Sequence, residues 1–417
     1  MKIWFFSHYF FPEGNAPATR VHQLCRRWAE AGHDVTVITG VPNVPAGVVY
    51  DGYQNRVRLQ VETIDRVRIL RVWTYIAANQ RLVRRVLNYA SFMCSAVLVA
   101  MFRPRPDVII ATSPQFFCGW AGAIAAWLKR RPFVLEVRDL WPESIVAVGA
   151  MKRGALLRSL EWLERRLYRA ATHIVAVGEG YRRGLLERGV ESTRITLIPN
   201  GVDANLYQPR APDGEIRSNY GLGGKLVCSY VGTIGMASGL DVVLRAARLL
   251  ADSEDSRFAF LLVGDGADRE KLERRVAEAG LAGIHFAGRQ PKSQIPGFLS
   301  ATDVCLVHLR KKPLFRDVLP SKIFEALAME KPVLLGVEGE AAALVERSGG
   351  GLCFEPENER ELVAGLRRFA DEPDLGVSLG RAGRAYALEH FDRDRQARDY
   401  ALLLQRFVAG DTTGGRR

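Results

Sequence analysis

The stretch Phe260-Leu261-Leu262-Val263-Gly264-Asp265-Gly266 decides the fold. In this stretch a short apolar run ends in a glycine turn. A pattern typical of a helix begins just after it, near Arg269. The same order, a short β-branched or aromatic run followed by a longer helical pattern, recurs along the chain. Such alternation is typical of βα units with a parallel sheet, so the sequence predicts the α/β class.

The βα units fall into two series, separated by a turn cluster at Pro199–Asp203. Each series predicts a doubly wound, Rossmann-like domain. We expect an N-terminal domain at 1–203, a C-terminal domain at 204–385, and a helix at 386–410 that packs back on the N-terminal domain. Ligands of such sheets bind outside the carboxyl ends of the strands, and a cleft between the domains is the expected site. The expected strands are 3–7, 35–39, 67–72, 108–111, 133–137, 173–177 and 195–198, then 226–231, 258–263, 284–286, 304–307 and 333–335.

The positive charge of the chain lies in its first half. Residues 1–200 hold 28 Lys+Arg against 15 Asp+Glu, a balance of +13, whereas the remaining residues hold 30 against 31. Arginine, whose planar fork suits phosphate, supplies 25 of those 28 cations. We expect this half to face an acidic lipid surface, a diphosphate or a nucleic acid, although a solvated basic face is the plain alternative.

One apolar run, Val86–Phe102, carries no charge over 17 residues but is shorter than the ~20 residues that span a bilayer. It is either a buried helix of an α/β domain or a helix in the membrane interface. Six scattered cysteines without a C-x-x-C pair indicate a cytosolic protein with reduced thiols. No spacing of the histidines suggests a metal site. Arginines flank the run at Arg81, Arg84, Arg85, Arg103 and Arg105.

Two glycine loops of the second half are candidates for phosphate binding. Gly264-Asp265-Gly266 and the loop Gly232–Gly239, which includes Gly235, each close a strand and open a helix. Such turns expose backbone N–H groups to an anion, although any tight βα turn can use these glycines. Together the two loops favour a nucleotide site.

The stretch 317–333, DVLPSKIFEALAMEKPV, is the most specific of the chain. Ser321 fits a helix N-cap, and Lys322 and Glu325 share one face of the first turn. A cation here can hold a diphosphate, and Glu325 can accept hydrogen bonds from a ribose diol. A capped surface helix with a Lys322–Glu325 ion pair is the alternative.

In the first half, the segment Glu136–Ser144 follows an expected strand. Asp139 and Glu143 are candidates to position an acceptor hydroxyl or take its proton, and Arg138 is a candidate to bind an acceptor phosphate. A structural cluster of ion pairs is the alternative explanation.

These motifs together resemble family 4 of the retaining glycosyltransferases, which have the GT-B fold of two Rossmann-like domains facing a central cleft. The N-terminal half is similar to the WbuB-like transferases of bacterial surface polysaccharide assembly. The resemblance covers about residues 1–400. It rests on 198–203 IPNGVD, 263–266 VGDG, 286–289 FAGR and 325–333 EALAMEKPV, and for the narrower group on 11–20 FPEGNAPATR, 32–40 GHDVTVITG, 42–47 PNVPAG and 138–144 RDLWPES.

The resemblance implies roles for single residues. Glu325 would bind the ribose, Gly264, Asp265 and Gly266 would lie beside the nucleotide, and Arg289 would lie near the base. Asp317 stands at the first acidic place of the family's Glu-x7-Glu element, where relatives have Glu. Thr233 and Ser238 occupy the region of the usual diphosphate-binding Arg and Lys, so Lys322, Ser321 and backbone amides from Gly235 onward are expected there. Asn15, in the motif 11–20, would bind the acceptor together with Arg138 and Glu143.

The resulting hypothesis is a retaining, metal-independent glycosyltransferase without a cofactor, with Lys322, Asp317 and Asp139 as catalytic residues. It would move a hexosyl group, expected to be an N-acetylated amino sugar, from a UDP-sugar to a polyprenyl-diphosphate-linked acceptor at the inner face of the cell membrane, for O-antigen or capsule synthesis. The alternative enzyme is a sugar-nucleotide 2-epimerase of related fold. A nucleic-acid-binding protein is less favoured, because the basic half has no recognition motif.

Overall fold

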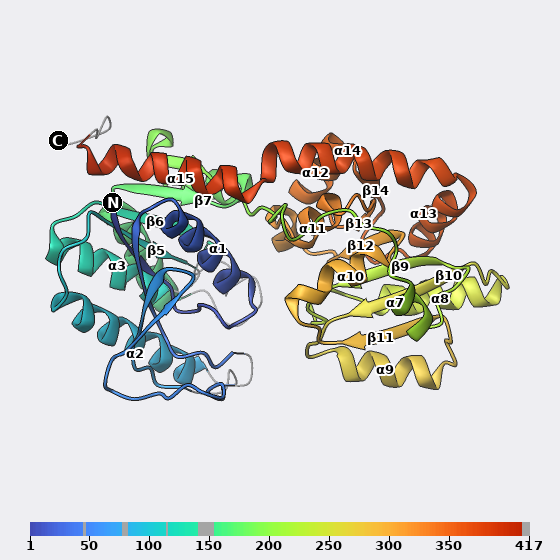
Figure 1. Ribbon diagram of the computed structural model, residues 1–417, viewed down its shortest axis with the longest axis horizontal. Coiled ribbons are helices and arrows are strands. Elements are labelled where there is room, and N and C mark those ends of the chain that lie inside the picture. The colour runs from blue at the N-terminus through green and yellow to red at the C-terminus, as the bar shows by residue number, and fades with distance from the viewer. Residues whose placement is uncertain (45–46, 77–81, 114–115, 141–153, 411–417) are drawn as a thin grey trace. The chain divides into compact units, whose positions relative to one another are not determined.

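The protein was analysed as a computed structural model, which describes residues 1–44, 47–76, 82–113, 116–140 and 154–410 (Figure 1). The chain forms two compact units. Unit 1 comprises Met1–Asn200 and the C-terminal segment from Arg393, and unit 2 comprises Gly201–Asp392. The divisions thus fall after residues 200 and 392 rather than after 203 and 385. Each unit is built on its own sheet, which confirms the predicted α/β class with two parallel-sheet domains.

Unit 1 contains an eight-stranded sheet in the order β3-β4-β2-β1-β5-β6-β7-β8. All neighbouring pairs are parallel except β3 with β4, which are joined by a turn at Asp65 and Arg66, both with positive φ. The strands are β1 (Lys2–Phe6), β2 (Asp34–Thr39), β3 (Gln60–Ile64), β4 (Val67–Arg71), β5 (Val108–Thr112), β6 (Phe133–Val137), β7 (His173–Ala176) and β8 (Ile195–Leu197). The helices are α1 (Ala16–Glu30), α2 (Leu82–Met101), α3 (Phe116–Lys129), α5 (Ala155–Ala170), α6 (Glu179–Glu187) and α15 (Arg393–Val408), with a 3₁₀ turn η1 (Ser192–Arg194).

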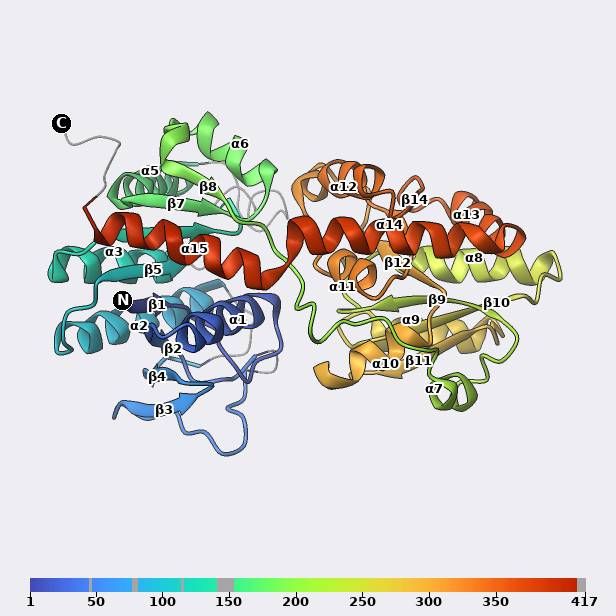
Figure 2. The ribbon, with the colours of Figure 1, turned by 45° about the horizontal axis from the view of Figure 1, so that its top comes forward.

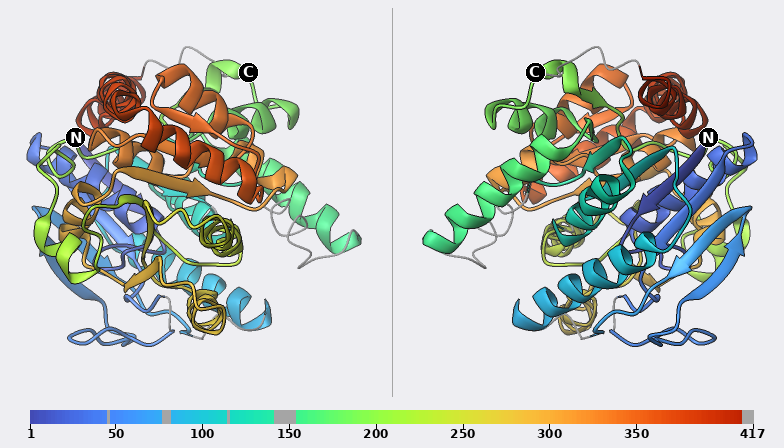
Figure 3. Two further views of the ribbon diagram at one scale, coloured as in Figure 1. Left: turned by 90° about the vertical axis from the view of Figure 1, so that its right-hand side faces the viewer. Right: turned by 90° about the vertical axis from the view of Figure 1, so that its left-hand side faces the viewer.

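Helices cover both faces of the unit 1 sheet. Helices α2, α3 and α5 lie on one face, and α1 and α15 lie on the other (Figures 2 and 3). Their apolar side chains belong to two separate core clusters, one on each face. The Trp28 indole of α1 donates a hydrogen bond to the carbonyl oxygen of Ala397, 2.8 Å away in α15, and Arg27 pairs with Asp394. The C-terminal helix is therefore part of unit 1.

The apolar run Val86–Phe102 forms most of α2, one side of which is buried in the core of unit 1. Phe92, Ala96 and Ala100 are fully buried against the sheet, whereas Leu87 and Leu98 are half exposed. No helix among the described residues is long and apolar enough to cross a bilayer.

Unit 2 contains a six-stranded parallel sheet in the order β11-β10-β9-β12-β13-β14. Counted along the chain from β9, this is the order 3-2-1-4-5-6 of dinucleotide-binding sheets, in which the strand order reverses between β9 and β12. The strands are β9 (Leu226–Val231), β10 (Phe258–Val263), β11 (Ile284–Gly288), β12 (Val304–His308), β13 (Val333–Gly336) and β14 (Gly351–Cys353). The helices are α7 (Gly214–Asn219), α8 (Asp241–Asp252), α9 (Arg269–Glu278), α10 (Ile295–Ser300), α11 (Lys322–Ala328), α12 (Glu340–Ser348), α13 (Glu359–Asp371) and α14 (Pro373–Phe391), with 3₁₀ turns η2 (Lys292–Gln294) and η3 (Pro313–Asp317).

The two strands that the sequence did not predict, β3 and β14, are both edge strands. β3 alternates between half-buried and exposed positions, and β14 has only three residues. The sequence of a short or half-exposed strand has few apolar residues in a recognisable pattern. Pairing with the neighbouring strand therefore determines where such a strand forms.

Candidate functional site

The predicted donor residues of unit 2 all follow the carboxyl ends of four adjacent strands. Gly235 follows β9, Gly264 to Gly266 follow β10, and Arg289 follows β11. The segment from Asp317 in η3 to Glu325 in α11 follows β12. The reversal of strand order lies between β9 and β12, and ligands of open α/β sheets bind at such a point. The structure thus brings these residues to one edge of one sheet, although they span 90 positions of sequence.

The two glycine loops contact each other through their backbones. The Gly232 N–H donates to the Val263 carbonyl at 2.8 Å, and the Ile234 N–H donates to the Asp265 carbonyl at 2.9 Å. A Cβ atom on Gly264 would lie 1.9 Å from the Gly232 oxygen, and one on Gly266 would lie 2.4 Å from the Ile234 oxygen. Both glycines also have positive φ. They are therefore required by the close packing of the loops, whatever the loops bind.

Lys322 reaches from α11 to the first of these loops. Its Nζ atom lies 3.5 Å from the centroid of the buried Tyr230 ring and near the position that a Cβ atom of Gly232 would take. The Tyr230 hydroxyl donates to the Thr233 carbonyl at 2.8 Å, so this ring is fixed to the loop. The aromatic face stabilises the ammonium group and directs it toward the glycine loop.

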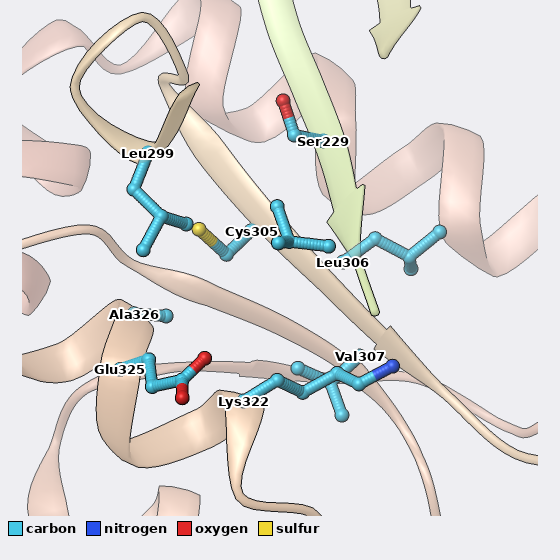
Figure 4. Close-up of a pocket in the computed structure, with 9 residues that line it drawn as sticks. Ser229, Leu299, Cys305, Leu306, Val307, Lys322, Glu325 and Ala326 are labelled. Atoms are coloured by element: carbon cyan, nitrogen blue, oxygen red, sulfur yellow. The ribbon is translucent and has the colours of Figure 1, made fainter. Parts of the chain in front are cut away.

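The carboxylate of Glu325, one turn along α11, lies apart from the Lys322 ammonium (Figure 4). Within the described part of the chain no ion pair joins it to Lys322, so the alternative of an i,i+3 ion pair is wrong. Both side chains line a pocket between β9, β12 and α11. The other lining residues are Ser229, Val231, Leu299, Cys305, Leu306, Val307 and Ala326.

Three further predicted donor residues lie near the carboxyl edge of the same sheet. Ser321 precedes α11 but has helical φ and ψ, and its side chain makes no capping hydrogen bond, so the predicted N-cap is wrong. Asp265 accepts the Gly266 N–H at 2.8 Å and lies 3.9 Å from Arg269, which shapes the second glycine loop. Arg289 directly follows Gly288, whose carbonyl accepts the Gly264 N–H at 2.9 Å.

Sequence reasoning did not find the residues that hold the first glycine loop. His308, at the end of β12, is fully buried, and its Nδ1–H donates to the Ser238 carbonyl at 2.7 Å. Its Nε2 accepts the Glu357 N–H at 2.9 Å, so the ring is neutral, and burial lowers the pKa of His308. The Nε–H of Arg310 donates to the Met236 carbonyl at 2.7 Å. These partners lie about 70 positions apart in sequence, so no local pattern could indicate them.

In unit 1 the strand order reverses between β1 and β5, and the predicted acceptor residues follow β1 and β6. Asn15 is the N-cap of α1, where its Oδ1 accepts the Ala18 N–H at 2.9 Å. Arg138 and Asp139 directly follow β6, and the Arg138 N–H donates to the Ser113 hydroxyl at 3.0 Å. Glu143 lies outside the described residues.

Arg138 stands beside a buried ion pair. Arg20 and Glu136 are both nearly inaccessible, and the Arg20 guanidinium lies 3.1 Å from the Glu136 carboxylate. Arg20 also donates to the carbonyls of Ile198 and Pro199. The buried Nη1 of Arg138 has no hydrogen-bond partner among the described residues. Burial lowers the pKa of Arg138 to about 10, so the group is still a cation at neutral pH.

Among the residues that the structure describes, no group of three or more His, Cys, Asp or Glu side chains is arranged to hold a metal ion. An Asp-x-Asp sequence does occur at Asp392–Asp394. It lies at the start of α15, where Asp394 pairs with Arg27 of α1.

Two protein-family models match this chain, one in each unit. A model described as "Glycosyl transferase 4-like domain" matches residues 15–201, and one described as "Glycosyl transferases group 1" matches residues 213–386. The chain is a family 4 glycosyltransferase of the GT-B fold. The first match covers most of unit 1 and the second most of unit 2. The comparisons give no support to the sugar-nucleotide 2-epimerase alternative.

Two curated glycosyltransferases show the extent of the similarity. The putative colanic acid biosynthesis glycosyl transferase WcaI of Escherichia coli K12 is 27% identical over 415 residues, which cover 96% of this chain and 98% of WcaI. The probable glycosyltransferase WbjE of Pseudomonas aeruginosa is 25% identical, over 73% of this chain and 75% of WbjE.

Solved structures of GT-B glycosyltransferases have the same fold at low identity. Sucrose-phosphate synthase from Thermosynechococcus elongatus has a TM-score of 0.75 and 18% identity, with 98% of this chain and 99% of that chain covered. HepE of Anabaena in complex with UDP-glucose has a TM-score of 0.70 and 18% identity, with 97% and 99% covered.

Proposed function

We propose that this glycosyltransferase moves a hexosyl group from a UDP-sugar to a polyprenyl-diphosphate-linked acceptor in bacterial surface polysaccharide synthesis. The observation that carries the proposal is the position of Lys322, between the glycine loop and Glu325 at the carboxyl edge of the unit 2 sheet. A diphosphate beside the ammonium would leave the ribose within reach of Glu325. The complexes of HepE with UDP and UDP-glucose support a uridine nucleotide, and the similarity to WcaI supports a polysaccharide product.

The proposed chemistry retains the anomeric configuration and requires no metal. Departure of the nucleoside diphosphate places negative charge on its phosphate oxygens, and the Lys322 ammonium, which the Tyr230 ring holds beside the glycine loop, would stabilise that charge. The diphosphate oxygen released from the sugar would take the acceptor proton on the same face. Asp317 would contact the donor sugar, and Arg289 would lie beside the base. The protein then contributes charge stabilisation and positioning rather than a strong base.

We assign the acceptor to unit 1. The unpaired Nη1 of Arg138 would bind an acceptor phosphate, and Asp139 would orient the attacking hydroxyl, with Asn15 and Glu143 beside them. An N-acetylated amino sugar is the donor that the subgroup resemblance favours, and O-antigen or capsule is the expected product. The basic charge of residues 1–200 supports peripheral binding to the inner face of the cell membrane.

The test is transfer by the purified protein from a panel of UDP-, GDP- and dTDP-sugars to a short-chain polyprenyl-diphosphate sugar, followed by mass spectrometry. Nuclear magnetic resonance of the new linkage reads its anomeric configuration. We expect a product from a UDP-sugar only, with retention and undiminished yield in a chelator. Inversion would refute the proposed chemistry, and turnover of the nucleotide sugar without any acceptor would refute the transfer itself.

A further inference from the structure

Large apolar side chains are exposed along α2 and at the carboxyl ends of α2 and α3. Phe102 and Trp127 are 76% and 77% exposed. Single exposed apolar residues are ordinary, but these belong to one group. Because Leu87, Leu98 and Met101 are spaced by 11 and 3 positions, they lie on one side of α2. The group, here named the α2–α3 surface, comprises Leu87, Leu98, Met101, Phe102, Trp127 and Leu128.

The two helix ends that carry Phe102 and Trp127 are tied together. The Lys129 ammonium donates to the carbonyls of Met101 at 3.0 Å and of Arg103 at 2.7 Å. The helices lie side by side on one face of the unit 1 sheet (Figure 1). Phe102 lies between Met101 and Arg103 in the sequence, and Trp127 lies two residues before Lys129. The Lys129 hydrogen bonds therefore hold the segments of Phe102 and Trp127 close to each other.

Basic side chains are exposed in the loops that follow α2 and α3. Arg105, Arg130 and Arg131 are exposed. The loop after α2 also contains the acidic residue Asp107, whose carboxylate accepts the Lys2 N–H at 2.7 Å. Exposed aromatic side chains with exposed arginines in the adjoining loops match the interface of an anionic bilayer, where aromatic rings lie at the headgroup level and cations meet phosphates.

A second copy of the chain is a poorer occupant of this surface. A two-fold interface would place the patch that holds Arg105, Arg130 and Arg131 against the same patch of the other copy, which would bring six cations together. Like charges at an interface oppose association. An anionic lipid surface has the complementary charge.

We propose that the α2–α3 surface is the part of unit 1 that docks on anionic lipid, with α2 lying along the membrane. Since α2 connects the parallel strands β4 and β5, it runs from the carboxyl edge of the sheet to the amino edge. At ~1.5 Å per residue its 20 residues span about 30 Å. Its amino end lies at the edge that carries Arg138, so a docked α2 would bring the proposed acceptor residues to the headgroup region. The inference rests on the proposed membrane location but not on glycosyl transfer, so binding without substrate tests it alone.

The experiment is sedimentation of the full chain with vesicles of phosphatidylglycerol and phosphatidylcholine, and with vesicles of phosphatidylcholine alone. One variant carries Phe102→Ser and Trp127→Ser, and a second carries Arg105→Ser, Arg130→Ser and Arg131→Ser. Leu402→Ser is the matched control, because Leu402 is 57% exposed on α15, which covers the other face of the sheet. Thermal melting confirms that each variant is folded.

We expect the wild-type chain and Leu402→Ser to bind the anionic vesicles equally, and each surface variant to bind at least about tenfold more weakly. Trp127→Phe should bind like the wild type but lose part of the blue shift in tryptophan fluorescence. The proposal is overturned if the wild-type chain ignores anionic vesicles at low salt, or if the surface variants bind as well as Leu402→Ser. It is also overturned if the wild-type chain is a dimer that Phe102→Ser with Trp127→Ser dissociates.

Discussion

Gly264 faces the carbonyl oxygen of Gly232 so closely that a Cβ atom on Gly264 would lie 1.9 Å from it. This contact joins the loops after β10 and β9, and therefore the two backbones proposed to surround the nucleotide. Its consequence is that the glycine pattern, which the sequence presents as a phosphate-binding feature, is first a packing requirement. A substitution at Gly264 would therefore disturb both the packing of the loops and the proposed nucleotide site.

Gly264→Ala should lower the free energy of unfolding by at least about 2 kcal/mol, because the added methyl group meets backbone and φ is positive. Gly223→Ala is the control, since a Cβ atom there meets nothing within 4 Å. Denaturant unfolding measures both. Equal stability of the two variants would show that the loops separate at little cost.

Lys322→Met should reduce kcat/KM by about 10²-fold, near ~2.7 kcal/mol, because one fixed charge that stabilises the leaving diphosphate is lost. Methionine can still pack against the Tyr230 ring. Lys225→Met, which lies just before the amino end of β9, should keep the wild-type rate. Steady-state kinetics at saturating acceptor gives the values. A Lys322→Met rate within twofold of the wild type would exclude Lys322 from the site.

Glu325→Gln should weaken UDP binding by about tenfold, since a charged acceptor for the ribose hydroxyls is lost. The wild-type enzyme should also prefer UDP over 2′-deoxy-UDP, and the variant should bind the two nucleotides alike. Calorimetry measures all four affinities. A variant that still distinguishes the two nucleotides would refute the ribose contact.

Arg138→Met should raise the KM for a diphosphate-linked acceptor by about tenfold or more, because a charge-assisted hydrogen bond to phosphate is lost. The affinity for UDP should not change, since the donor residues belong to unit 2. Arg183→Met, at an exposed position of α6, is the control. A changed UDP affinity would contradict the assignment of the acceptor to unit 1.

Acidification should destabilise the fold through its buried histidines. Burial lowers the pKa of His8 to about 3 and also lowers that of His308. Below the ordinary histidine pKa of 6.5, His8 and His308 bind protons in the unfolded chain but not in the folded chain. The free energy of unfolding that they contribute is therefore fully present above pH 6.5 and is lost as the pH falls. His8 should contribute up to about 1.4 kcal/mol per pH unit between pH 6.5 and about 3, and His308 should add to the loss in the same direction.

Denaturant unfolding at pH 7.5 and 5.5 tests this effect. His308→Gln retains a donor and an acceptor but does not titrate, so the loss of stability between the two pH values should be smaller in that variant. An unchanged loss would mean that His308 does not contribute to it.

The sequence alone predicted the α/β class, the two series of βα units and the strands of both cores. It could do so because buried parallel strands are short apolar runs whose pattern is local, as at Phe258–Val263, where the predicted and observed bounds agree. The resemblance to family 4 came from motifs of a few residues each, and these are local too. The N-cap at Ser321 failed because the side-chain hydrogen bond of a cap depends on backbone angles that the sequence pattern does not fix.

Only the tertiary structure decided how distant residues meet. The stacking of Lys322 on Tyr230, the anchoring of the glycine loop by His308 and the link that Lys129 makes between the ends of α2 and α3 each join segments that lie 25 or more positions apart. Sheet order and helix packing set such contacts, and neither is written in the local periodicity of a strand or helix. The sequence therefore determined which elements form, and the packing of those elements determined which side chains share a site.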